Sequence, residues 1–106
     1  MQSLKIAHAD NGDNTILAAQ GAGKVIRVLA YVLVGAGTVA AKWKSGASTD
    51  LTGPMSLVAA SNLVAPPCIS PGIRPAYFET AANEALVLNL SGAVAVNGHI
   101  LYEVIG

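Results

Sequence analysis

The stretch KVIRVLAYVLV, Lys24–Val34, decides the fold class of this chain. It contains no Gly, Pro, Asn or Asp, and it lies between Gly23 and Gly35. Val, Ile and Tyr suit the pleated surface of a strand, and β-branched side chains are stiff in a helix, so the stretch predicts one long strand. A strand that is apolar on both faces is expected to pack against other parts of the protein on both sides, either in the centre of a sandwich or at a subunit interface. One face carries Val25, Arg27, Leu29, Tyr31 and Leu33, and the other carries Ile26, Val28, Ala30, Val32 and Val34.

Length and composition predict a single domain that associates with copies of itself. The chain has 106 residues, the size of one domain over residues 1–106, and a net charge of zero. It therefore has neither the basic footprint of a nucleic-acid binder nor a polybasic membrane patch. Charged residues make up 11% of the chain, against about 25% in an average soluble domain. So few charges cover a monomer's surface poorly, and we expect a homo-oligomer that buries part of that surface.

A transmembrane helix over residues 25–41 is the alternative to a soluble strand. The segment is apolar and close to the minimum length for spanning a bilayer. Arg27 lies inside it, Gly35 and Gly37 interrupt it, and Val, Gly and Thr are poor helix formers. We therefore favour the soluble strand and expect no membrane partner. The first residues show no signal-peptide pattern, and the single cysteine, Cys68, cannot form an intrachain disulfide.

Short strands separated by turn residues run along the whole chain. Val39, Ala41 and Trp43 alternate with polar or small residues, as expected of a half-buried strand with Trp43 in the core. Asn97-Gly98 predicts a hairpin turn. The spacing predicts an all-β antiparallel sandwich, similar to a jelly roll. The eight predicted strands are Leu4–Ala9, Thr15–Ala19, Lys24–Val34, Thr38–Lys44, Met55–Ala60, Tyr77–Thr80, Glu84–Leu90 and His99–Ile105.

Two segments stand apart from this strand pattern. Residues 1–13 comprise an N-terminal arm together with the first strand. Residues 62–76 contain four prolines, which remove ladder donors, so we expect an extended irregular loop there. Loops of this length in a small domain are usually functional or belong to an interface.

The residue types of enzymes and metal sites are present, but not in the required spacing. Gly21–Lys24 lacks the first glycine and the hydroxyl of a phosphate-binding loop, and it leads into a strand. Asp10–Asn14 lacks the order of a calcium loop and reads as a plain turn. His8 and His99 would approach each other if the terminal strands paired, yet two histidines alone do not make a metal site. We therefore expect no enzyme activity, no metal and no cofactor.

Six segments of turns and strands form a familiar order along the chain: GDNTI at Gly12–Ile16, GKVIRV at Gly23–Val28, WKSG at Trp43–Gly46, FETA at Phe78–Ala81, EALVLNLS at Glu84–Ser91, and Gly98-His99. In this order the chain resembles small virion proteins of tailed bacteriophages and prophages, of the capsid decoration (cement) or head-fibre kind. The resemblance covers most of the chain, roughly residues 6–105, and its motifs are strand and turn patterns without chemistry.

The resemblance implies an all-β protein, often trimeric, that lies on the outer capsid surface of a virion after synthesis in the bacterial cytoplasm. Its expected partners are copies of itself and the major capsid protein. Candidate capsid contacts are Met1, Gln2, Ser3, Leu4, Lys5, Pro66, Pro67, Ile69 and Pro71. Candidate core or oligomer-interface residues are Val28, Tyr31, Val32, Trp43 and Tyr102. A fibre or tail adhesion module that binds carbohydrate is the alternative, and clustered exposed aromatic side chains would favour it.

Overall fold

A computed structural model describes residues 2–59, 62–65 and 77–106, with the backbone alone in 62–65. The described residues form ten strands and no helix, so none of them lies in a helix able to cross a membrane. The strands are β1 Gln2–His8, β2 Gly12–Leu17, β3 Val25–Gly35, β4 Val39–Ser45, β5 Thr49–Asp50, β6 Met55–Leu57, β7 Asn62–Ala65, β8 Phe78–Glu79, β9 Leu86–Leu90 and β10 Val96–Ile105.

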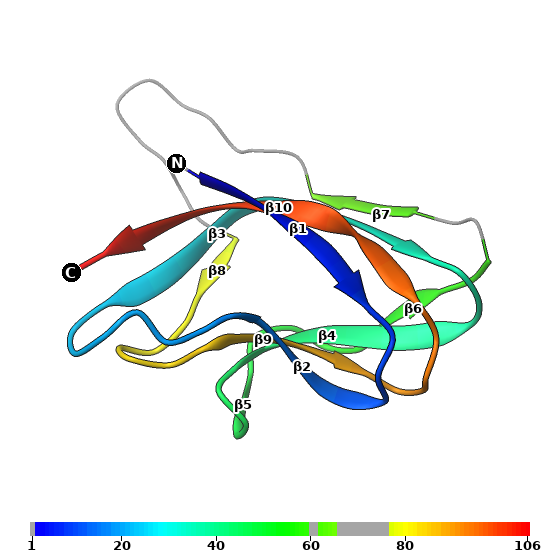
Figure 1. The fold of residues 1–106 in the computed structure, drawn as a ribbon, viewed down its shortest axis with the longest axis horizontal. Helices are drawn as coiled ribbons and strands as arrows, with labels where there is room; N and C mark the ends of the chain where they lie inside the picture. The colour runs from blue at the N-terminus through cyan, green and yellow to red at the C-terminus, as the bar shows by residue number, and fades with distance from the viewer. Residues whose placement is uncertain (1, 60–61, 66–76) are drawn as a thin grey trace.

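The strands form two antiparallel sheets that lie on one another as a sandwich (Figure 1). Sheet A has the order β1-β10-β3, and β7 and β8 both pair with the far edge of β3. Sheet B has the order β2-β9-β4, and β5 and β6 both pair with β4. The predicted all-β antiparallel sandwich is therefore confirmed. On one side each sheet ends in two short strands that pair with different parts of the same long strand, which is β3 in sheet A and β4 in sheet B.

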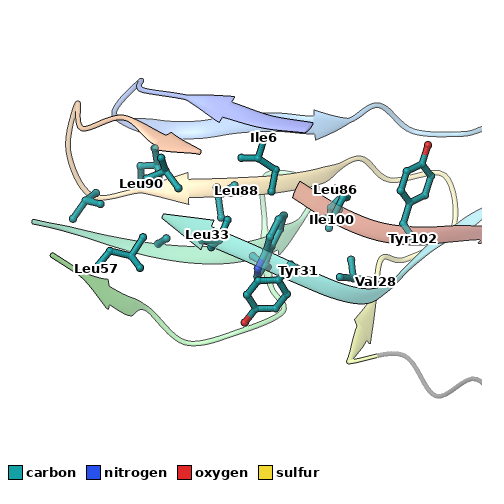
Figure 2. Packing of buried hydrophobic residues seen from close by; sticks show 14 of the residues in the cluster. Ile6, Val28, Tyr31, Leu33, Leu57, Leu86, Leu88, Leu90, Ile100 and Tyr102 are labelled. Carbon is teal, nitrogen blue, oxygen red and sulfur yellow. The ribbon is translucent and has the colours of Figure 1, made fainter. Parts of the chain in front are cut away.

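The core lies between the two sheets and is built from alternate residues of each strand (Figure 2). Trp43 of β4 is fully buried at its centre, as the alternation around it predicted. The other residues of the cluster are Ile6, Ile26, Val28, Tyr31, Leu33, Val39, Ala41, Leu57, Leu86, Leu88, Leu90, Val96, Ile100 and Tyr102.

A β-bulge in β3 makes the predicted assignment of its two faces wrong. β3 pairs with β10 in one register up to Ala30 and in a shifted register from Val28, so Leu29 is the extra residue. A one-residue insertion moves the following side chains to the opposite face. Val28 therefore faces the core on one side of the bulge, and Tyr31 and Leu33 face it on the other. The periodicity of two that the sequence suggested holds only within each half of the strand.

Asn97-Gly98, predicted as a hairpin turn, lies inside the long strand β10. Gly98 pairs with Ile6 on one side and Leu33 on the other, and it has a φ of 151°. A Cβ on Gly98 would lie 1.8 Å from the carbonyl oxygen of Val32. The glycine thus permits a close approach of two backbones, which is the other common reason for glycine in a strand.

Three further boundaries differ from the sequence prediction. The first strand begins at Gln2, so little of the predicted arm lies outside the sheet. β2 begins at Gly12 and takes up part of the predicted turn. The predicted irregular loop loses Asn62–Ala65, which pairs with β3 as β7. The prolines that predicted the loop follow this strand, outside the described residues.

Buried hydroxyl groups connect the two sheets at one end. Thr80 accepts a hydrogen bond from the backbone N–H of Ile26, at 3.0 Å. Ser45 accepts one from the N–H of Ala81, at 2.9 Å, and donates to the carboxylate of Glu84, at 2.5 Å. These bonds satisfy backbone donors that would otherwise be buried without partners, which is costly. They fix the turn between β8 and β9 against β3 and β4.

We predict that Gly98→Ala lowers the free energy of unfolding by about 1–3 kcal/mol or more, because the new Cβ would collide with β3 in a strained backbone conformation. Urea denaturation followed by circular dichroism measures this change. Gly92→Ala is the matched control, since a Cβ there meets no atom within 4 Å. Equal denaturation midpoints for the two variants would contradict the packing argument.

Candidate interface surfaces

Most of the predicted core or interface residues belong to the core of a single protomer. Val28, Tyr31, Trp43 and Tyr102 are all buried between the sheets. Val32 is the exception, because it is half-buried and lies on the outer side of sheet A. Among these five residues, only Val32 is therefore placed to contact another molecule.

An aromatic cluster joins the sheets near the middle of the sandwich. The ring of Tyr31 in sheet A lies 5.5 Å from the ring of Trp43 in sheet B, at an interplanar angle of 63°. Phe78 contacts both rings. Burial raises the pKa of Tyr31, whose hydroxyl donates to the sulfur of Met55 at 3.4 Å. The buried Nε1 of Trp43 has no hydrogen-bond partner among the residues that the structure describes, so this side chain contributes packing to the core.

The outer face of sheet B carries a network of charged and amide side chains, which we call the charged face: Asp13, Lys42, Lys44, Asp50 and Asn89. Asp13, Asn89 and Lys42 stand opposite one another on β2, β9 and β4. Lys44 lies 3.1 Å from Asp13, and Lys42 lies 3.2 Å from Asp50. Lys44 is buried within this network and also donates to the carbonyl of Ala47, at 3.0 Å, whereas Asp13 and Asp50 are exposed to solvent. The side chains thus pair with one another across neighbouring strands.

Asp13 is the centre of the charged face. The Nδ2 of Asn89 donates to its carboxylate at 2.7 Å, and Lys44 donates to the same group. The hydrogen bond from Asn89, together with the bond and the positive charge of Lys44, holds the pKa of Asp13 below its usual value, although burial opposes this shift. The ionised form of Asp13 is therefore the form that the folded state prefers.

The outer face of sheet A is different, and we call it the apolar face: Ala7, Val32, Val34, Leu101 and Ile105. Cross-strand pairing places Ala7 and Val34 in one row on either side of Asn97. Val34 is 37% exposed and Ile105 is 42% exposed. These two residues lie at opposite ends of β10, because Val34 stands opposite Asn97 and Ile105 opposite Val25, with His99 and Glu103 between them on the same face. The neighbouring exposed apolar residues are Ala7 and Val34, and exposed apolar side chains that lie together indicate a contact surface.

An ion-pair group lies toward one end of the apolar face. Arg27 of β3 stands between Glu79 of β8 and Glu103 of β10 in the sheet register. Its NH1 lies 2.8 Å from Glu103, and its Nε lies 3.5 Å from Glu79. Glu103 is largely covered whereas Glu79 is more than half exposed, so this group is a partly buried pair with an outer carboxylate.

The two histidines do not meet, although the terminal strands β1 and β10 pair with each other. His8 stands opposite the core residue Val96, whereas His99 stands opposite Lys5 and Val32. Side chains alternate along a strand, so His8 and His99 lie on opposite faces of sheet A. Over the described ranges, no group of three or more His, Cys, Asp or Glu residues is arranged to hold a metal ion.

The predicted capsid contacts divide into two sets. Gln2, Ser3, Leu4 and Lys5 form the first half of β1, at the edge of sheet A. Gln2, Ser3 and Lys5 are exposed, whereas Leu4 packs partly against the core. The others, Met1, Pro66, Pro67, Ile69 and Pro71, lie outside the described residues.

The charged face is not among the sites that the sequence pattern predicts. Local pattern places Asp13 in a turn and Lys42 and Lys44 at the polar positions of the strand that contains Trp43. The alternation of inward and outward residues was the one local signal for this network, because outward side chains of neighbouring strands lie beside one another. What the sequence lacked was the strand order that places β2 and β9 beside β4.

We predict that Asp13 contributes stability at neutral pH that is lost in acid. Its pKa is lowered in the folded state, so the contribution is present above the usual Asp pKa of about 3.9 and disappears as the pH falls through the folded value. Asp13→Asn should therefore be less stable than the parent at pH 7, and this difference should shrink at pH 3. Urea midpoints at both pH values measure the effect, with Asp10→Asn as a control for charge removal from an exposed turn. A difference that is the same at both pH values would refute the role of this carboxylate.

The described surfaces thus comprise an apolar face on sheet A, a charged face on sheet B and the exposed edge of β1. No protein-family model, curated protein or solved structure matches this chain.

Proposed function

We propose that this protein is a structural component of a phage virion that decorates or cements the outer capsid surface as a homo-oligomer. In this proposal its partners are the major capsid protein and copies of itself, and it acts by binding rather than by catalysis. The resemblance described above suggests this class and implies three copies in the assembly. A head-fibre role uses the same surfaces and belongs to the same proposal.

The observation that carries the proposal is the contrast between the two outer faces of the sandwich. The charged face pairs its side chains with one another, as in Lys42 with Asp50 and Lys44 with Asp13. The outer face of sheet A instead exposes Ala7 and Val34 on either side of Asn97, at the end away from the Arg27 ion pairs. Interface cores are depleted of charged residues. The apolar face is therefore the surface that we assign to the capsid.

The strand order supports a jelly-roll connectivity for the sandwich. When β5 with β6, and β7 with β8, are each counted as one interrupted strand, strands at equal distance from the middle of the chain pair: β1 with β10, β2 with β9, β3 with β7 and β8, and β4 with β5 and β6. A long hairpin rolled into two sheets produces this order, and jelly rolls are common in viral capsid proteins. Fold alone does not establish function, so this point supports the proposal without carrying it.

A carbohydrate-binding or adhesion module has less support. Such a module would need aromatic rings gathered on the surface. Tyr31, Trp43 and Tyr102 are buried instead, and Phe78 packs against the core. Tyr77 is exposed, and its ring lies 6.4 Å from that of Tyr31. One exposed ring beside a buried cluster is a weak platform for a sugar.

The proposed contact of the N-terminal residues with the capsid is compatible with their position. Ser3 and Lys5 project from the same side of sheet A as Val34, because they stand opposite outward residues of β10. The exposed part of β1 therefore extends the apolar face toward one edge. Removing these residues would also remove part of a sheet, so point substitutions are the cleaner test.

We predict that the protein sediments with shells assembled from the major capsid protein of a phage genome that carries its gene. Val34→Glu should weaken this binding by tenfold or more, because assembly would remove water from a charged carboxylate without giving it a partner, and a tenfold loss corresponds to only about 1.4 kcal/mol. Thr15→Glu, an exposed substitution on the outer side of sheet B, should leave binding unchanged.

Two outcomes would overturn this function. One is a folded parent protein that does not sediment with the shells at any concentration tested. The other is an equal loss of binding in the Val34 and Thr15 variants, which would remove the apolar face from the contact. Binding to a panel of host-surface polysaccharides, without binding to shells, would favour the adhesion module.

A further inference from the structure

β1 is unlike the other strands at the sheet edges. Among the described strands it pairs only with β10, over seven consecutive residues and with no register shift. It contains no proline, and Lys5 is its one Lys, Arg, Asp or Glu residue. An exposed, regular edge of this length offers a row of unpaired N–H and C=O groups that can accept another strand.

The other edges carry the features that block strand addition. β2 has a bulge between Thr15 and Leu17. The far edge of sheet A is divided into β7, with four residues, and β8, with two. The far edge of sheet B is divided into β5, with two residues, and β6, with three. Bulges and very short strands are the usual means of protecting an edge, so β1 alone among the described edges keeps the geometry for pairing.

We propose that β1 pairs with β1 of a second copy, antiparallel and about a two-fold axis, so that sheet A continues from one protomer into the other. A two-fold contact uses the same surface on both copies and closes on itself, which accounts for a single open edge. The exposed Ser3, Lys5 and Ala7 lie on the outer side of this edge, and Ile6 lies on the core side.

Face and charge limit the register of this pairing to two arrangements. Residues that stand opposite each other must project from the same face of the continuous sheet, so odd residues pair with odd and even with even. A two-fold axis at Lys5 would place two lysines directly opposite, which is unfavourable. The remaining arrangements that keep at least five residues paired have the axis at Leu4, with Lys5 opposite Ser3 of the second copy, or at Ile6, with Lys5 opposite Ala7.

This inference rests on only one part of the proposed function, the self-association of the protein. A two-fold contact joins two protomers, or two of the trimers that the resemblance implies. We therefore expect a native mass of two or six copies.

The test uses Ser3 and Ala7, the two residues that can face Lys5, and replaces each of them in separate variants by lysine and by glutamate. Ser3→Lys or Ala7→Lys places a lysine opposite Lys5 twice in each dimer and should raise the dissociation constant at least several-fold. The corresponding glutamate variant should lower it, and high salt should reduce both effects. Sedimentation equilibrium of the full chain at low and high salt measures both constants. Thr15→Lys and Thr15→Glu on β2 are the controls.

Opposite shifts for lysine and glutamate at position 3 support the axis at Leu4, and at position 7 the axis at Ile6. Shifts of the same sign, or no shift at either position, overturn the proposal, as does a parent mass of one or three copies. Binding to shells by a protein whose association ignores these charges would leave the proposed function standing without this contact. Dimers that respond to these charges but do not bind shells would support the β1 contact and refute the proposed function.

Discussion

The pairing of β3 with β10 is the constraint on which the rest of this structure depends. The two strands run side by side through the middle of sheet A, and the bulge at Leu29 sets which side chains of β3 reach the core. On one side of the bulge Val28 faces inward, and on the other side Tyr31 does, where it meets Trp43 of sheet B. Gly98 allows the same pair of strands to approach closely at the other end. The pairing of β3 with β10 thus determines which side chains of β3 face the core and which face outward.

The two outer faces follow from this arrangement and differ in kind. Sheet B turns outward a set of side chains that neutralise one another, with Asp13 held between Asn89 and Lys44. Sheet A turns outward Val34 and Ile105, with Arg27 and its carboxylate partners toward one end. Both outer faces therefore carry charged side chains, but the ion pairs of Arg27 lie toward one end of sheet A. The other end, with Ala7 and Val34, is suited to burial, and the regular edge of β1 adjoins it.

Much of the fold followed from local pattern. The apolar run around β3 and the alternation around Trp43 predicted strands because a pleated surface with one buried side needs those residues in that order. Turn residues between the runs predicted antiparallel connections. Site prediction was less complete. Val28, Tyr31, Trp43 and Tyr102 were candidates for the core or for an oligomer interface, and they lie in the core of the protomer, whereas local pattern did not predict the charged face.

The errors have a common physical cause. Asn97-Gly98 reads as a turn from local chemistry, yet the carbonyl of Val32 lies where a larger residue at Gly98 would place its Cβ. The two faces of β3 follow an unbroken alternation in the sequence, yet a bulge reverses it at Leu29. Both features depend on a neighbouring strand that is distant along the chain, and local pattern carries no information about that neighbour.

The sequence by itself therefore determined that this protein is a small all-β antiparallel sandwich with Trp43 in its core, because residue preference and alternation are local properties of the chain. The tertiary structure decided which residues face outward, which of them meet across strands and which sheet edge stays open. Those properties arise from register and strand order, which pair residues as far apart as Gln2 and Tyr102. Local preference cannot specify such pairs, since many registers satisfy the same alternation.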